Sequence, residues 1–402
     1  MVILPVLACF ALLPGAQAIC NEGCGSNFNT FEGEDALINT TGSGNTAFGW
    51  KSLTFDTDGS FNTGIGGGAL ALNNGGSNTA VGAGALLLNT TGVENNAVGT
   101  DALVFNSIAS NNNAFGTFAL FNNDSSGTGL ASFNNAHGRN ALFSNVDGTQ
   151  NNAFGDDAME FNTSGNFNTA VGDDALISND TGSSNVAVGD EAGNAILDGN
   201  NNVAVGAFAG TTFVSASNNI AIGAPGAGPF ADVSNTCFIG SIFDEPVSDS
   251  GSAQDVYVDQ FNVLGFLPSS KRFKHDIQPM AKASEVLLAL KPVTFKYNSD
   301  KNGKTQYGLI AEEVAEVAPD LVFRDKNGDV ETVRFEQVGA MLLNEFLKEH
   351  KKVEQLQATV AQQQKGMEVL TAQLKEQAAQ IQKVSARLEM SRPTAKVVVT
   401  KP

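Results

Sequence analysis

The chain has 402 residues, of which 42% are hydrophobic, 16% are charged and 43 are glycine. This apolar content is enough for a folded core and excludes a chain that is disordered throughout. The charge is uneven, because residues 19–268 carry two basic residues against 25 acidic ones, whereas residues 269–402 carry 21 against 17. The change predicts at least two unlike domains. Since nucleic-acid binding depends on clustered Lys and Arg, we expect no nucleic-acid partner.

The N-terminus is a short apolar run that ends in Ala-Gln-Ala, which is typical of a signal-peptide cleavage site after Ala18. We therefore expect residues 1–18 to be a signal peptide and the mature chain to be secreted or held at a cell surface; a buried N-terminal segment is the alternative. No other run of 18 or more apolar residues occurs, so we expect no membrane-spanning segment in the mature chain. Cys20 and Cys24 could close a small loop, which would leave Cys237 free.

A repeat occupies the chain from residue 45 to about residue 240, where the motif Asn-x-Ala-(Val/Phe/Ile)-Gly-x-x-Ala-Leu recurs at intervals of mostly 17 residues. Such a constant period is the signature of a solenoid. Each period contains a brief apolar strand, a glycine that can adopt positive φ at a corner, and a polar turn. We predict a mainly β fold in which residues 45–245 form a parallel β-roll of about twelve 17-residue coils, behind an N-terminal cap at residues 19–44. The motif glycines are Gly49, Gly66, Gly82, Gly99, Gly116, Gly138, Gly155, Gly172, Gly189, Gly206, Gly223 and Gly240.

Two positions of the repeat carry most of its regularity. Asn stands four residues before the glycine in eleven of twelve coils, as in Asn45 and Asn151. We expect these side chains to point inward and form an amide ladder along the stack, in preference to an array of ligand-binding amides. The residue before the glycine is apolar in eleven coils, and His137 is the exception. Because His137 belongs to a coil with 22-residue spacing, we interpret it as part of a bulged loop and not as a metal ligand.

Acidic pairs follow the glycine on three successive coils, and their first members are Asp156, Asp173 and Asp190. In a parallel stack these carboxylates would lie about 4.8 Å apart and repel one another. They must then be solvated, or bridged by a hard cation such as calcium, which prefers oxygen ligands. We expect a solvated acidic edge, with a calcium ladder as the alternative. We expect no other metal and no cofactor.

The pattern Asn-Thr-Ala-Val-Gly at residues 78–82 and 168–172 resembles the head repeats of trimeric autotransporter adhesins. The resemblance covers about residues 40–245. It implies left-handed parallel β-rolls that associate as a trimer with a surface-binding role. A cell-surface molecule or a glycan is therefore a candidate ligand of the repeats. The period is longer and more regular here, and the C-terminus lacks that family's four-strand membrane anchor. Residues 246–268 break the period, and we interpret them as a connector.

The composition changes again at residue 269. Residues 287–297, 306–314 and 330–335 resemble, in this order, the endosialidase-type intramolecular chaperone family. Members of that family are C-terminal, self-cleaving serine peptidase domains of phage tail spikes and related fibres. The resemblance covers about residues 269–350 and implies a small α+β chaperone domain that assists trimerisation.

The same resemblance implies a catalytic dyad, a serine followed five residues later by a lysine, which here selects Ser269 and Lys274 with Arg272 between them. A serine hydroxyl becomes a nucleophile when a base takes its proton, and a lysine can be that base only where burial or nearby cations lower its pKa. Ser269 would attack the preceding carbonyl and break the bond between Pro268 and Ser269. Many members have an acidic residue after the serine, where this chain has Ser270, so the adjacent hydroxyl is an alternative nucleophile.

A heptad pattern closes the chain. It predicts a coiled coil at residues 351–390, followed by a disordered tail at residues 391–402. A three-stranded coiled coil would match the trimer that both resemblances imply, and a two-stranded coiled coil is the alternative. The a positions are Phe346, Val353, Val360, Met367, Leu374, Ile381 and Leu388, and the d positions are Leu342, Glu349, Leu356, Gln363, Leu370, Gln377 and Val384.

These patterns together predict an exported homotrimeric fibre or adhesin-like surface protein, whose chaperone drives trimerisation and then cuts itself off in a single turnover. One alternative is an uncleaved structural or adhesive fibre with an inactive chaperone domain. Another is a polysaccharide-active enzyme, which would need two carboxylates across a groove. The regular spacing of the acidic pairs argues against such an enzyme.

Overall fold

The computed structural model describes residues 22–24, 27–223, 232–242, 246–247, 251–261, 263–300 and 302–391. The expected signal peptide, Cys20 and the tail beyond Ser391 lie outside these residues. The chain divides into two compact units, Met1–Ala253 and Gln254–Pro402, and each is described by itself. Among the described residues, no helix is long and apolar enough to cross a membrane.

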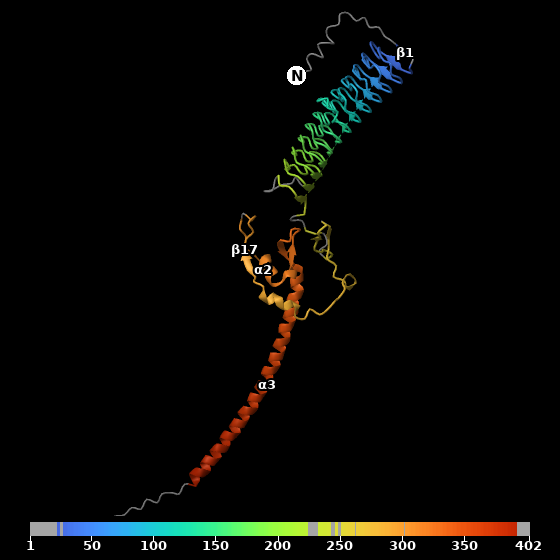
Figure 1. Ribbon diagram of the computed structural model, residues 1–402. Helices are drawn as coiled ribbons and strands as arrows, with labels where there is room; N and C mark the ends of the chain where they lie inside the picture. Colours follow the sequence, from blue (N-terminus) through green and yellow to red (C-terminus); the bar gives the residue numbers. More distant parts are fainter. Residues whose placement is uncertain are drawn as a thin grey trace, which may run out of the picture. The chain divides into compact units, whose positions relative to one another are not determined.

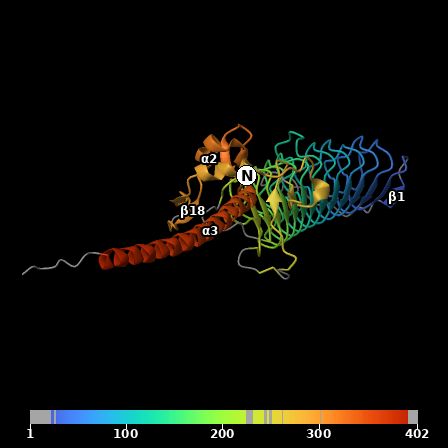
Figure 2. The same ribbon diagram turned by 90° about the horizontal axis from the view of Figure 1, so that it is seen from below.

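The first unit is a β-solenoid in which short strands stack as successive rungs of one sheet (Figures 1 and 2). Strands β2 to β14 pair in parallel and in sequence order, and β1 pairs antiparallel with β2. This confirms the predicted parallel β-roll. The strands are β1 (Glu22–Cys24), β2 (Thr30–Glu32), β3 (Thr46–Phe48), β4 (Thr63–Ile65), β5 (Thr79–Val81), β6 (Asn96–Val98), β7 (Asn113–Phe115), β8 (Asn135–His137), β9 (Asn152–Phe154), β10 (Thr169–Val171), β11 (Val186–Val188), β12 (Val203–Val205), β13 (Ile220–Ile222) and β14 (Cys237–Ile239).

The core of the solenoid is narrow and is filled mainly by alanine. The middle residue of most strands is an alanine that points inward, as Ala80 and Ala97 do, and in most coils an Ala-Leu pair after the glycine is also fully buried, as Ala85 and Leu86 are. Because neighbouring strands lie about 4.8 Å apart, equal positions of successive coils stack in columns. Most coils therefore add a thin layer of two alanines and one large side chain to a continuous core.

The corner glycines of the motif are required by geometry. At Gly82 φ is +139°, a conformation that side chains rarely adopt, and an added Cβ would lie 2.3 Å from the carbonyl oxygen of Gly99 in the next coil. The corners of successive coils are thus in backbone contact, which explains why the glycine recurs without exception through the repeat.

Two columns of buried asparagine run along the solenoid, and they differ in their partners. In the predicted column, Asn62 Oδ1 accepts the backbone N–H of Asn78 at 2.9 Å, and Asn62 Nδ2 donates to the carbonyl of Gly75 at 2.9 Å. This column therefore bonds mainly to the backbone. The expectation that its side chains form a ladder of amides is wrong for this column. The amide ladder forms in a second column, seven residues after each glycine, where Nδ2 of Asn89 donates to Oδ1 of Asn73 at 2.6 Å. The ladder consists of Asn73, Asn89, Asn106, Asn123, Asn145, Asn162 and Asn179, all fully buried.

The interpretation of His137 as part of a bulged loop is wrong. His137 lies in β8, in register with Phe115 and Phe154, and its ring stacks on both at centroid distances of 4.7 and 4.8 Å. The five extra residues of this coil lie between Asn123 and Ala131. The Nδ2 atom of Asn123 donates to the carbonyl of Ala131 eight residues on, whereas the equivalent bond in other coils spans three residues. The insertion therefore enlarges a surface turn and leaves the strand in register.

The solenoid also begins earlier than the sequence analysis placed it. Within the expected cap, β2 pairs in parallel with β3, and the side chains of Ala36 and Leu37 are buried in the common core. Asn29 Oδ1 accepts the N–H of Asn45 at 2.7 Å, as in later coils. The cap therefore contains a further coil, whose motif differs because Phe31 replaces the inward-facing alanine.

The second unit combines three two-stranded antiparallel sheets with helices. Its small core consists of Val314, Ala318, Leu321, Val322, Val333 and Met341. The elements are β15 (Tyr257–Val258), β16 (Leu264–Gly265), η1 (Lys271–Phe273), η2 (Ala283–Ala289), β17 (Val293–Phe295), β18 (Gln306–Gly308), α2 (Ala311–Val317), η3 (Pro319–Leu321), β19 (Val322–Arg324), β20 (Val330–Val333) and α3 (Phe335–Met390).

The C-terminal helix α3 has 56 residues and is gently curved (Figure 1). It begins sixteen residues before the predicted coiled coil, and its first turns pack on the small core through Met341. The predicted seam is exposed: Val353 is 47% and Leu356 is 63% accessible. These predicted seam positions therefore form no buried contact within the single chain.

Candidate functional site

The sequence-predicted dyad is brought together within one chain. Ser269 and Lys274 lie on either side of η1, a single 3-10 turn in which the N–H of Lys274 donates to the carbonyl of Lys271 at 3.1 Å. This turn folds the chain back, so that Nζ of Lys274 donates a hydrogen bond to Oγ of Ser269 at 3.2 Å. The contact has the distance that a base needs to take the hydroxyl proton.

The dyad is exposed to solvent. All residues from 269 to 279 are exposed, and the Arg272 guanidinium lies 4.7 Å from the ring centre of Phe273. Next along the chain, Nε2 of His275 lies 3.8 Å from a carboxylate oxygen of Asp276. A lysine acts as a base only after its ammonium loses much of its hydration. The single chain therefore supplies the distance between the two groups but not the desolvation.

The bond before Ser269 is equally accessible. Residues 266–268 have no regular secondary structure, and the side chains of Phe266 and Leu267 are 61% and 58% exposed. Upstream, the hairpin β15–β16 exposes Val258 at 65% and Leu264 at 68%. This apolar stretch just before the dyad is unusual for a surface in water, because contiguous exposed apolar groups mark contact sites.

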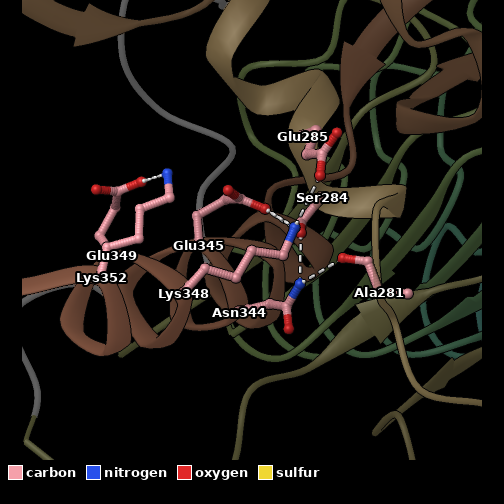
Figure 3. Close-up of polar contacts among 8 residues, drawn as sticks. All are labelled: Ala281, Ser284, Glu285, Asn344, Glu345, Lys348, Glu349 and Lys352. Carbon is pink, nitrogen blue, oxygen red and sulfur yellow. Dashed lines mark hydrogen bonds and ion pairs between the residues drawn. The ribbon is translucent and has the colours of Figure 1, made fainter. Parts of the chain in front are cut away.

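A second polar cluster, which the sequence analysis did not single out, joins η2 to α3 (Figure 3). Ser284 is fully buried, its Oγ donates to Oε1 of Glu345, and it accepts from Nδ2 of Asn344 at 2.6 Å. Asn344 also donates to the carbonyl of Ala281 at 3.0 Å, and Nζ of Lys348 lies 2.7 Å from Oε1 of Glu345. We name Ser284, Asn344, Glu345 and Lys348 the η2–α3 clamp.

Electrostatics support the clamp. The Lys348 ammonium and the Ser284 hydroxyl hold the pKa of Glu345 below its usual range, and Glu345 in turn raises the pKa of Lys348. The spacing of Glu345 and Lys348 is the ordinary i, i+3 pairing of a helix surface, so the ion pair could be predicted from the sequence, whereas its buried serine partner could not. Because Ser284 is fully buried, its hydroxyl is out of reach of a substrate, and we interpret the clamp as a structural joint.

Two open apolar cavities flank the first turns of α3. One, of about 670 Å³, is lined by residues that include Met280, Val286 and Met341. The other, of about 660 Å³, is lined by residues that include Tyr307 and Leu342, which are 82% and 56% exposed. The start of α3 therefore continues the exposed apolar stripe of its C-terminal part into the chaperone region.

The acidic edge of the solenoid binds the preceding coil. Asp156 Oδ1 accepts the N–H of Arg139 at 2.9 Å, and the guanidinium of Arg139 lies 3.2 Å from Asp157. Desolvation and the neighbouring carboxylates of Asp173 and Asp157 raise the pKa of Asp174. Within the described ranges, no group of three or more His, Cys, Asp or Glu side chains is placed to hold a metal ion. The alternative of a calcium ladder at Asp156, Asp173 and Asp190 gains no support from this geometry.

Comparison with known families identifies part of the second unit. Residues 269–323 match the model of the peptidase family described as the chaperone of endosialidase. The comparisons with curated proteins and with solved structures returned no match. The matched range starts at Ser269 and includes Lys274, η2 and β18, while residues 330–335, part of the resemblance seen in the sequence, lie beyond it. The chain therefore carries a chaperone-of-endosialidase domain behind a β-solenoid, a combination that fits a tail-fibre-like protein.

Proposed function

We propose that this chain is an exported fibre protein that assembles as a homotrimer, and that its C-terminal domain then cleaves the bond between Pro268 and Ser269 once. The observation that carries the proposal is the 3.2 Å contact of Lys274 Nζ with Ser269 Oγ, at the first residue of the range that matches the peptidase family.

The reaction uses groups of this chain only. Lys274, as a neutral amine, takes the proton of the Ser269 hydroxyl while Oγ attacks the carbonyl carbon of Pro268. The proton then passes to the amide nitrogen of Ser269 as the C–N bond breaks, which leaves Pro268 joined to Ser269 Oγ as an ester. Water hydrolyses the ester, so that a carboxylate ends at Pro268 and the serine hydroxyl is restored. No exogenous substrate takes part.

Assembly supplies what the single chain lacks. Because the dyad is exposed in one chain, its lysine is desolvated only when another copy covers it. Cleavage then follows assembly and does not precede it. This order is useful for a parallel β-solenoid, whose non-local pairings form slowly, because the helical C-terminal domain can hold the copies together while the coils stack.

Three exposed apolar surfaces favour a second copy of the same chain as the partner. The residue before each corner glycine faces outward along the whole solenoid, as Ile65, Phe154 and Ile222 do at 42%, 41% and 45% exposure. The connector hairpin and the heptad seam of α3 are exposed too. An apolar group that recurs once per coil matches a partner with the same period, and the chain itself has that period.

The first test is cleavage in purified protein. The wild type should yield a fragment of residues 269–402 in denaturing mass spectrometry, Ser269→Ala should stay intact, and Ser270→Ala should be cut like the wild type. If Ser270→Ala alone abolished cutting, the adjacent hydroxyl would be the nucleophile. Intact wild-type chains in a stable trimer would instead identify the protein as an uncleaved fibre with an inactive peptidase centre.

A further inference from the structure

The amide ladder of the solenoid has a carboxyl group at its N-terminal end. From Asn179 down to Asn89, each Asn seven residues after a corner glycine donates to the Asn of the preceding coil, and the last acceptor is Asn73. One coil before Asn73 the same position holds Asp56, which is fully buried. Asp56 therefore occupies a place that is filled by an amide in the seven coils that follow.

The hydrogen-bond partners of Asp56 are neutral. Its Oδ1 accepts the N–H of Gly59 at 3.1 Å, and its Oδ2 accepts from Asn45 Nδ2 and Thr40 Oγ1, both at 3.4 Å. The amide of Asn73 bonds to it as well. None of the ion pairs found in the described part of the chain includes Asp56. Two of its bonds are long, so they solvate a negative charge poorly.

Burial and a neighbouring negative charge both make ionisation of Asp56 harder. Burial raises the pKa of the Asp56 carboxyl to about 7, and the negative charge of Asp58 on the same turn adds to the effect. Hydrogen bonds from Gly59, Thr40 and Asn73 lower the pKa only in part. A buried carboxylate without a cation is unfavourable, whereas a carboxylic acid is a neutral group of nearly the size and shape of the asparagine amide.

We propose that Asp56 is a proton-binding site that couples pH to the closure of the N-terminal coils of the solenoid. In its protonated form the side chain continues the neutral ladder below Asn73. When the proton leaves, the buried charge gains hydration if the turn at residues 54–59 opens to water. The seven coils from Asn73 to Asn179 carry an amide at this position, and the next two carry Ile196 and Phe213, so the closure of these coils lacks this dependence on pH.

The direction of the effect follows from linkage. The pKa of Asp56 is raised in the folded coil above the ordinary value of 3.8. Its contribution to closure is therefore fully present below about pH 4 and is lost as the pH rises through about 7. Between these values the opening constant rises by up to about tenfold per pH unit, and it levels off above them.

Hydrogen exchange on the full chain tests the proposal. The N–H of Asn62, which donates to Asn45 Oδ1 at 2.8 Å beside Asp56, reports on the N-terminal coils. The equivalent N–H of Asn168, which donates to Asn151 Oδ1 at 3.0 Å, is an internal reference. From pH 5 to pH 7 the protection factor of Asn62, relative to that of Asn168, should fall by roughly one to two orders of magnitude in the wild type.

The matched variants are Asp56→Asn, which places the ladder residue at its own position, and Asp58→Asn, which removes the exposed neighbouring charge. Asp56→Asn should make the ratio independent of pH, and Asp58→Asn should keep the fall. A ratio that does not change with pH in the wild type, or that falls equally in Asp56→Asn, would overturn the proposal. A carboxyl ¹³C titration gives a second, direct reading: the resonance absent from Asp56→Asn should titrate near pH 7, and a midpoint near 4 would contradict the proposal.

Discussion

The Nζ atom of Lys274 lies 3.2 Å from the Oγ atom of Ser269, and one 3-10 turn closes the five-residue separation between them. The pair is thus positioned by local chain geometry and needs no tertiary contact to meet. In the proposed mechanism, assembly would then have to remove the pair from water. A centre of this kind can be present in every unassembled chain and yet stay inactive until copies meet.

Replacing the lysine by another cation tests its role as a base. Lys274→Arg keeps a positive charge near Ser269, but a guanidinium does not give up its proton in proteins. We expect Lys274→Arg to lose cleavage by at least about a hundredfold, as removal of a general base does. Lys271→Arg, on the same exposed turn, is the control and should cut normally. Cleavage by Lys274→Arg at the wild-type rate, followed on a denaturing gel, would remove Lys274 from the mechanism.

The buried serine of the η2–α3 clamp gives a stability prediction. Ser284→Ala leaves Asn344 Nδ2 and Glu345 with one partner fewer, so we expect it to lower the free energy of unfolding of the second unit by about 1 to 2 kcal/mol. Glu349→Gln breaks an exposed pair with Lys352 on the same helix. It should change the free energy of unfolding by less than about 0.5 kcal/mol. Denaturant unfolding measures both, and equal effects would show that the clamp adds nothing beyond a surface ion pair.

The clamp should also weaken in acid. The pKa of Glu345 is lowered in the folded state by Lys348 and Ser284, so its contribution is present above the ordinary pKa of a glutamate and is lost as the pH falls through the lowered value. The second unit is expected to lose stability below about pH 4.5, and Glu345→Gln should flatten that dependence in urea melts at several pH values. The pKa of Asp56 is shifted in the opposite direction, upward, so acid should stabilise the first coils of the solenoid while it destabilises the clamp.

A corner glycine, Gly82, and a glycine outside the corners, Gly67, form a matched pair for the solenoid. Gly82→Ala places a methyl group 2.3 Å from a backbone oxygen at a φ of +139°, and we expect a loss of about 3 kcal/mol or more, because backbone must move in two coils. At Gly67 the nearest atom to an added Cβ is 3.9 Å away and φ is not positive, so Gly67→Ala should be nearly neutral. Thermal unfolding of both variants checks the prediction, which fails if they melt alike.

The exposed seam of α3 predicts the association state. Leu356→Glu puts a charge at a d position that is 63% exposed in one chain, and burial of that charge would oppose association. Sedimentation should show a trimer for the wild type and a shift toward monomer for Leu356→Glu. Gln355→Glu, one position away and off the seam, should remain assembled. A monomeric wild type at micromolar concentration would contradict the proposed trimer.

The sequence predicted the solenoid well because its information is local and repeated. A 17-residue period fixes which residues share a column, and parallel pairing of β5 with β6 follows directly from it. The first coil was missed because Phe31 stands where later coils have alanine, although Asn29 and Gly33 keep the phase. His137 was misplaced because a spacing of 22 residues shows that a coil is longer without showing where.

The candidate site was predicted in its composition but not in its surroundings. A five-residue separation can be closed by one turn, so Ser269 and Lys274 could be paired from the sequence and the family resemblance. The bond from Ser284 to Glu345 joins residues 61 apart, and no periodicity links them. The amide ladder was expected in the column that includes Asn62, and the second column was not recognised. Both columns are buried, and only atomic positions show that Asn73 bonds to Asn89 while Asn62 bonds to the backbone.

The two asparagine columns restrict changes in the length of the solenoid to whole coils. Removing or adding one whole period leaves every column continuous and changes the shaft by about 4.8 Å, whereas a partial period would misalign both columns at once. The enlarged turn between Asn123 and Ala131 shows a second kind of change. Extra residues lengthen a surface turn, and the rise per coil is unaffected. A chain built in this way can vary its reach in steps and carry new surface loops without redesigning its core.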